Sequence, residues 1–112
     1  MLFRSSSRNA YLKGDDHRAA TVLHRSLAQA QREIARGERD AVRLIGAIRK
    51  VLGSEPAAAP DYVEIVDADT LEPVTRLRRA CLVLMAVRVG GVRLLDNMLV
   101  EETPDGAMVT SL

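Results

Sequence analysis

The sequence has a single cysteine, Cys81, so it can form neither an internal disulfide nor a Cys-x-x-Cys metal site. Scarce cysteine is typical of proteins from a reducing compartment, and we therefore expect a cytoplasmic location. Cys81 lies within the apolar run of residues 80–87. A thiol in such surroundings is predicted to be buried and inert rather than nucleophilic.

Long apolar segments and an excess of one charge are also absent. No segment approaches the roughly 18 consecutive apolar residues of a membrane-spanning helix, and Met1–Arg4 lacks the apolar stretch of a signal peptide. The formal net charge is only +1, whereas nucleic-acid binders and proteins of anionic membranes usually carry a basic surplus. We therefore expect a soluble chain with neither nucleic acid nor a membrane as partner.

Aromatic residues make up 3% of the chain and apolar residues 47%, which predicts a core of leucine, valine, isoleucine and alanine. At 112 residues, the chain is large enough for one domain with a single core. His17 and His24 would lie two helical turns apart, a poor spacing for a shared metal, so we predict surface histidines and no metal site. Outside the first few residues, no phosphate loop, catalytic carboxylate pair, Ser-His-Asp set or internal repeat is present.

Two helices are predicted in the first half of the chain. From Asp15 to Arg36, apolar residues recur at helical spacing, and Gly37 can take the left-handed conformation that ends a helix. The apolar stripe of this helix consists of Leu23, Leu27, Ala30 and Ile34. A second helix is expected from Asp40 to Leu52, before Gly53. A connection of about three residues implies an antiparallel helical hairpin.

Extended structure is predicted in the second half. Residues 54–60 form a proline-containing linker that cannot continue the helix, and Tyr62–Val66 is predicted to be a strand. The apolar run 80–87 predicts a central strand with both faces covered. Gly90 and Gly91 suit a type I′ hairpin, whose register sets Val87 opposite Leu94 and Arg88 opposite Arg93. The expected fold class is therefore α+β, with the helical hairpin packed on a three-stranded antiparallel β-sheet.

Several charged residues are interpreted as structural. Opposed Arg88 and Arg93 repel, so we expect them to spread into solvent or to pair with acids, with anion binding as the third possibility. Asp96 and Asn97 would face Met85 and Leu84. We interpret the two polar residues as anchors, with Arg93 or a helix-end N–H as the partner of the carboxylate. A basic cluster (Arg76, Arg78 and Arg79) is interpreted as a charged rim before the central strand.

The candidate binding residues are Ser6, Ser7 and Arg8. Two hydroxyls, backbone N–H donors and a planar guanidinium could hold a polyphosphate. The alternative is a disordered polar terminus with an incidental arginine.

The motif Ser6-Ser7-Arg8-Asn9-x-Tyr11-Leu12 resembles the start of the C-terminal domain of the pantothenate synthetase (pantoate–β-alanine ligase) family. The resemblance continues through Asp61-Tyr62-Val63-Glu64, Asp69-Thr70-Leu71-Glu72-Pro73 and Gly90-Gly91-Val92-Arg93-Leu94-Leu95-Asp96-Asn97, in the family's order. It implies the C-terminal lid domain of a nucleotidyl-transferase-type ligase. In that family the serine-arginine loop closes over ATP, so Ser6, Ser7 and Arg8 are the implied ATP-phosphate-binding residues. The resemblance implies no catalytic residue in this chain.

The reaction implied by this resemblance is ATP-dependent ligation. Pantoate and ATP would give pantoyl adenylate and pyrophosphate, and the amine of β-alanine would then give pantothenate and AMP. The co-substrate would be ATP with Mg²⁺. ATP, pantoate and β-alanine would be met mainly through an N-terminal nucleotide-binding domain, which has no counterpart in this sequence.

The resemblance also divides the chain. Residues 1–5 are interpreted as a leader outside the family or an engineered boundary, residues 6–100 as the C-terminal domain and residues 101–112 as a flexible tail. We expect the chain alone to be inactive, because the family's nucleotide-binding domain is not part of it. The alternative is a stand-alone binding or homodimerisation module that retains the fold without the chemistry.

Overall fold

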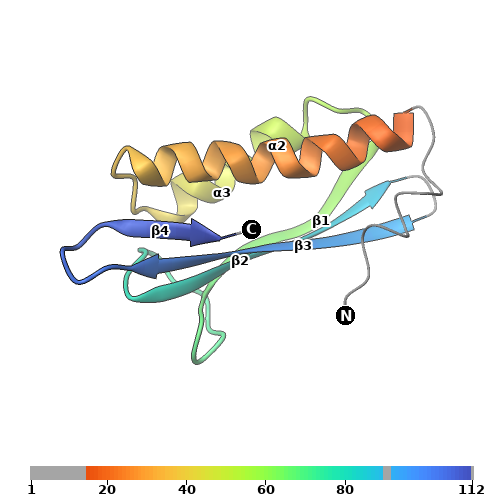
Figure 1. Ribbon diagram of the computed structural model, residues 1–112. Helices are drawn as coiled ribbons and strands as arrows, with labels where there is room; N and C mark the ends of the chain where they lie inside the picture. Colours follow the sequence, from red (N-terminus) through yellow and green to blue (C-terminus); the bar gives the residue numbers. More distant parts are fainter. Residues whose placement is uncertain (1–14, 90–91, 112) are drawn as a thin grey trace.

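The structure is a computed structural model that describes residues 15–89 and 92–111. Two helices pack on one face of an antiparallel sheet (Figure 1). The elements are α2 (Asp15–Ala35), α3 (Ala41–Leu52), β1 (Ala58–Asp67), β2 (Ala80–Val89), β3 (Val92–Glu102) and β4 (Met108–Ser111). The strand order is β1-β2-β3-β4. The α+β class and the helical hairpin on an antiparallel sheet are confirmed, but the sheet has four strands, not the three that were predicted.

Helix α2 follows its apolar stripe closely. Leu23, Leu27, Ala30 and Ile34 are all buried. The helix ends at Ala35, one residue before the predicted end, and Gly37 has a φ of 105°. The N–H of Gly37 donates to the carbonyl of Ile34 at 3.0 Å, which satisfies one of the free carbonyls at the helix end. The predicted glycine stop is therefore confirmed.

Helix α3 begins at a side-chain cap. Asp40 is extended, with a φ of −79°, and its Oδ1 accepts a hydrogen bond from the N–H of Arg43 at 3.1 Å. The predicted helix started at Asp40 itself, whereas Asp40 caps a helix that starts at Ala41. Both helices place their apolar residues against the same sheet face, and the short link makes them antiparallel neighbours, as predicted.

Strand β2 lies between β1 and β3, and its predicted pairing is confirmed. Val87 is opposite Leu94, and Arg88 is opposite Arg93. Alternate residues of β2 face the helices, among them Val83, Met85 and Val87, which are all buried. The turn residues, for which a type I′ hairpin was predicted, lie outside the described residues.

Strand β1 is longer than predicted. It begins at Ala58 and includes Pro60, whereas the sequence predicted a linker through Pro60 and a strand only from Tyr62. Proline is tolerated here because β1 is an edge strand of the sheet, where its missing N–H breaks no ladder. The register shifts between Pro60 and Tyr62, so Asp61 is an extra residue in the strand. Such a bulge bends the strand and redirects a side chain.

Strand β4 departs from the flexible tail that was predicted after Val100. Strand β3 continues to Glu102, and Met108–Ser111 pairs with it, with Ser111 opposite Leu99. The turn between them closes through the N–H of Thr103, which donates to the carbonyl of Ala107 at 2.7 Å. Gly106 takes a φ of 91°. Proline, aspartate and glycine at 104–106 are turn residues, so this stretch forms a hairpin.

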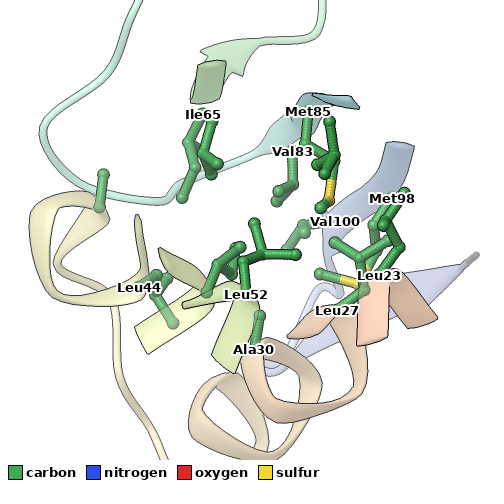
Figure 2. Close-up of a cluster of buried hydrophobic side chains, with 14 of the residues drawn as sticks. Leu23, Leu27, Ala30, Leu44, Leu52, Ile65, Val83, Met85, Met98 and Val100 are labelled. Atoms are coloured by element: carbon green, nitrogen blue, oxygen red, sulfur yellow. The ribbon is translucent and has the colours of Figure 1, made fainter. Parts of the chain in front are cut away.

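The core lies between the helices and the sheet. Figure 2 shows how Leu23 and Leu27 of α2 and Leu52 of α3 meet side chains of three strands. The strand side chains labelled there are Ile65, Val83, Met85, Met98 and Val100. The buried hydroxyl of Ser26 is satisfied because it donates to the carbonyl of Leu23 at 2.7 Å. The helices thus cover one face of the sheet.

The other face, here called the outer face, carries the alternate residues of the strands. On β2 these include Leu82, Leu84 and Arg88, and on β3 Arg93 and Leu95. Leu82 and Leu84 are half-buried and Leu95 is 60% exposed. The prediction that both faces of β2 are covered is therefore correct only for the helix-facing side. The outward-facing apolar residues of the run 80–87, such as Leu82 and Leu84, are only partly buried by neighbouring side chains on the outer face.

Substitution of Leu27 tests this core. Leu27 is fully buried, and Leu27→Ala removes its packing and leaves a cavity, so we expect a loss of about 3 kcal/mol in the free energy of unfolding. Urea denaturation measures the loss. Val42→Ala is the matched control, because Val42 is 71% exposed, and it should change stability by less than about 0.5 kcal/mol. Equal effects of the two substitutions would contradict the described packing of α2.

Asp67 gives the turn after β1 a pH dependence. Its Oδ1 accepts hydrogen bonds from the N–H groups of Asp69, at 2.8 Å, and Thr70, at 3.0 Å. The bond from Thr70, followed by that from Asp69, lowers the pKa of the Asp67 carboxyl below its ordinary value of 3.8. The carboxylate therefore stabilises the fold above about pH 4, and this contribution is lost as the pH falls through the lowered pKa.

Asp67→Asn is therefore expected to lower the melting temperature at pH 7 and to have progressively less effect below about pH 4. Thermal melts from pH 2 to pH 7 measure this. Asp69→Asn is the control of equal charge, because the Asp69 carboxylate accepts no hydrogen bond from the described residues. A pH-independent loss in Asp67→Asn would show that the charge of Asp67 does not support the turn.

Candidate functional site

The predicted ATP-phosphate-binding residues Ser6, Ser7 and Arg8 lie outside the described residues. The structure does describe the point at which the chain continues from them, which is Asp15 at the start of α2. Figure 1 places this helix start at the same end of the molecule as the end of β2 and the start of β3. Two contacts between α2 and the sheet are consistent with this orientation of the helix. The Ser26 hydroxyl lies 3.9 Å from the Met85 sulfur, and Gln31 Nε2 donates to Thr110 Oγ1 at 2.8 Å.

A charged cluster occupies the outer face at that end of the sheet. It consists of Asp61 on β1, Arg88 on β2 and Arg93 on β3, here called the Asp61 cluster. Arg88 Nε donates to Asp61 Oδ1 at 3.2 Å, and Arg93 Nε donates to Asp61 Oδ2 at 2.9 Å. One carboxylate therefore bridges two arginines that are directly opposed in the sheet. The expected pairing of these arginines with an acid is confirmed.

Arg93 has a second contact in the Asp61 cluster. Its guanidinium carbon lies 5.8 Å from the centre of the Tyr62 ring, within the range of a cation–π interaction. The hydrogen bond from Arg93 is also the main reason that the pKa of the Asp61 carboxyl is lowered from 3.8, with Arg88 contributing. Asp61 is thus ionised at neutral pH. The side chains of Arg88 and Arg93 are 64% and 50% exposed, so both remain accessible to solutes.

Asp96 and Asn97 face Met85 and Leu84, as predicted. Arg93 or a helix-end N–H was expected to serve as partner of the Asp96 carboxylate, but within residues 15–89 and 92–111 it has no hydrogen bond to either. Asp96 Oδ1 instead accepts a hydrogen bond from the N–H of Asn97 at 2.8 Å. Arg93 is directed to Asp61 because its side chain lies on the outer face, whereas alternation puts Asp96 on the helix-facing side.

Of the three arginines before β2, Arg79 lines a surface hollow of about 530 Å³ at the other end of the strand. Arg79 has a positive φ of 58° and is held in place by Glu102. The N–H of Arg79 donates to Glu102 Oε1 at 3.0 Å, and the N–H of Glu102 donates to the Arg79 carbonyl at 2.7 Å. Glu101 and Glu102 both line the hollow, so its charge does not favour a phosphate.

Few other candidate functional groups are present in the part of the chain that the structure describes. No group of three or more histidine, cysteine or acidic side chains there could hold a metal ion. Cys81 is buried and free, as predicted, and His24 is exposed. None of the described helices combines the length and the apolar character that a membrane crossing needs.

The sequence analysis did not identify Asp61 as the acid between the arginines. Pairing of β2 with β3 follows from the hairpin glycines, but pairing with β1 does not, because β1 is distant in sequence. The bulge adds a further shift of one residue at Asp61. A proline next to an acidic residue, inside a stretch that otherwise pairs as a strand, is the one signal for that bulge in the sequence.

The sequence was compared with known protein families and curated proteins. The family described as pantoate-beta-alanine ligase matches residues 3–99. Pantothenate synthetase of Heliobacterium modesticaldum is 50% identical over 96 residues, which cover 86% of this chain and 34% of that protein. Pantothenate synthetase of Koribacter versatilis is 45% identical over 96 residues, covering 86% and 33%.

The fold was compared with solved structures. It matches the crystal structure of pantothenate synthetase from Thermus thermophilus with a TM-score of 0.74 and 30% sequence identity. The match covers 83% of this chain and 33% of that chain. The present chain thus spans about a third of the length of the relatives it matches. Sequence and fold both match this family, and the chain belongs to the pantoate–β-alanine ligase family.

Proposed function

We propose that this chain serves as the C-terminal lid domain of a pantoate–β-alanine ligase. The observation that carries the proposal is that the family match covers residues 3–99 of this chain but only a third of the related ligases. The intact enzyme would join pantoate to β-alanine with ATP. Pantoyl adenylate would form first with release of pyrophosphate, and attack by the β-alanine amine would then give pantothenate and AMP.

In this proposal, Ser6, Ser7 and Arg8 bind the ATP phosphates. Negative charge accumulates on the phosphate oxygens and on the leaving pyrophosphate during adenylate formation. Hydroxyl and backbone donors together with a permanent cation stabilise that charge, provided they are positioned before the reaction. Mg²⁺ would be held mainly by the phosphates of ATP, as is usual for this ion.

A lid role fits what residues 15–89 and 92–111 contain. The core between helices and sheet is filled, and the polar groups within it are satisfied. No nucleophile with an adjacent base is present among these residues. A rigid two-layer domain of this kind can act by carrying a binding loop and excluding water from the reaction. Residues 6–100, together with the hairpin that ends in β4, would form that domain, and the active site would be completed by the other two-thirds of the enzyme.

The alternative is a stand-alone dimerisation module. A lid without its partner domain, or a module that binds a second copy, should expose a contiguous apolar patch. The four large apolar side chains that are well exposed among the described residues lie on α3, the turn after β1, β3 and β4. They are Val42, Leu71, Leu95 and Val109. Because either role would leave such a patch, these four side chains do not distinguish the lid from the module.

The proposed binding loop can be tested by amide NMR of the 112-residue chain titrated with Mg-ATP. We expect shifts at Ser6, Ser7 and Arg8, and loss of these shifts in Arg8→Ala, because the guanidinium is the permanent cation of the loop. Arg36→Ala, at the far end of α2, is the control and should leave the shifts unchanged. Absence of shifts at millimolar ATP would show that these residues do not bind the nucleotide in this chain.

Because the proposed active site is completed by the other two-thirds of the enzyme, we predict that the purified chain alone makes no pantothenate. Chain free of host ligase is incubated with ATP, Mg²⁺, pantoate and β-alanine, and both AMP and pantothenate are measured. A full-length relative serves as the positive control. Turnover that scales with the amount of the purified chain would overturn the lid assignment, because the chain would then contain the whole site.

A further inference from the structure

The Asp61 cluster has more positive charge than its own carboxylate neutralises. It combines two guanidinium ions with one carboxylate, which leaves the cluster itself with a net charge of +1. Both arginines use Nε to reach Asp61. Within the described part of the chain, no hydrogen bond engages the Nη groups of Arg88 or Arg93. Toward the described residues, each guanidinium therefore has N–H donors in its planar fork that are not used.

The position of both arginines is already restrained. Each is tied to one oxygen of the same carboxylate, and the Tyr62 ring lies against Arg93. Long side chains normally lose rotamer freedom when they bind a ligand, and restraint before binding reduces that loss. The strand pairing also fixes the separation of the two backbones, since Arg88 and Arg93 are direct neighbours across β2 and β3.

We propose that Arg88 and Arg93 form a binding site for a phosphoryl group on the outer face of the sheet. Paired guanidinium forks match the oxygens of phosphate, and a phosphate that carries two negative charges gains more from the cluster than a carboxylate does. Asp61 acts as the positioning residue. It holds the two like charges together while leaving one of them uncompensated.

The site lies at the end of the sheet where α2 begins, on the face opposite the helices. The site does not rest on the ligase proposal, because its geometry involves only β1, β2 and β3.

The test is a titration of the 112-residue chain with inorganic pyrophosphate at low ionic strength, followed by amide NMR and calorimetry. We expect saturable shifts around Arg88 and Arg93. Arg88→Gln should weaken binding about five-fold, because one of two cations is lost. Asp61→Asn should tighten it about five-fold, because it raises the charge of the cluster by one unit while the amide oxygen of asparagine still accepts a hydrogen bond from one of the arginines.

Matched variants separate this effect from net charge. Arg36→Gln and Asp69→Asn make the same changes in total charge away from the cluster, and both should leave the affinity unchanged. A tightening in Asp61→Asn is a result that a purely structural ion pair would not produce. Arg88→Lys keeps the charge without the fork, so it should bind more weakly than the parent chain. Thermal melts establish that each variant is folded.

The outcomes distinguish this site from the ATP loop. Pyrophosphate shifts at Arg88 and Arg93 that persist in Arg8→Ala support the site independently of the ligase proposal. Unchanged affinity in both Arg88→Gln and Asp61→Asn would overturn it, even if ATP still shifts Ser6–Arg8. Equal binding of acetate would overturn the assignment to a phosphoryl group.

Discussion

The apolar stripes of α2 and α3 need a partner surface, and the helix-facing side chains of the central strands supply it. Leu27 of α2 and Leu52 of α3 are fully buried against this face, together with Met85 of β2 and Met98 of β3 (Figure 2). Fully burying a side chain of this size contributes roughly 1.5–3 kcal/mol. Since that burial uses one face of the sheet, Arg88 and Arg93 are left on the outer face.

Most of the fold could be predicted from local chemistry. The end of α2 follows from the left-handed conformation of Gly37, and the start of α3 follows from the side-chain cap at Asp40. Both signals act over only a few residues. The pairing of Arg88 with Arg93 follows from a two-residue hairpin. The extension of β1 and the pairing of β4 were not predicted, because each depends on an edge position that is known only once the strand order is fixed.

The candidate site was predictable only in part, because it too depends on how the strands are arranged in the sheet. The repulsion between Arg88 and Arg93 follows from the hairpin, so an acidic partner was one of the expected solutions. Choosing Asp61 requires the register of β1 and the bulge between Pro60 and Tyr62, which are tertiary features. The predicted serine-arginine loop had a different source. Its role came from family resemblance, and neither periodicity nor spacing distinguishes Ser6–Arg8 from a polar terminus.

The exposure of the Asp61 cluster limits what it can do in an open domain. Arg88 is 64% exposed, and charges on such side chains are screened by salt over about 8–10 Å. The same charges interact more strongly once water is excluded, because the effective dielectric falls. A second surface that closes over the outer face would therefore strengthen the contact of the cluster with a bound phosphate. An ion pair that keeps two arginines together but only half neutralised would suit the proposed lid, since closure would raise the affinity that the exposed cluster already has.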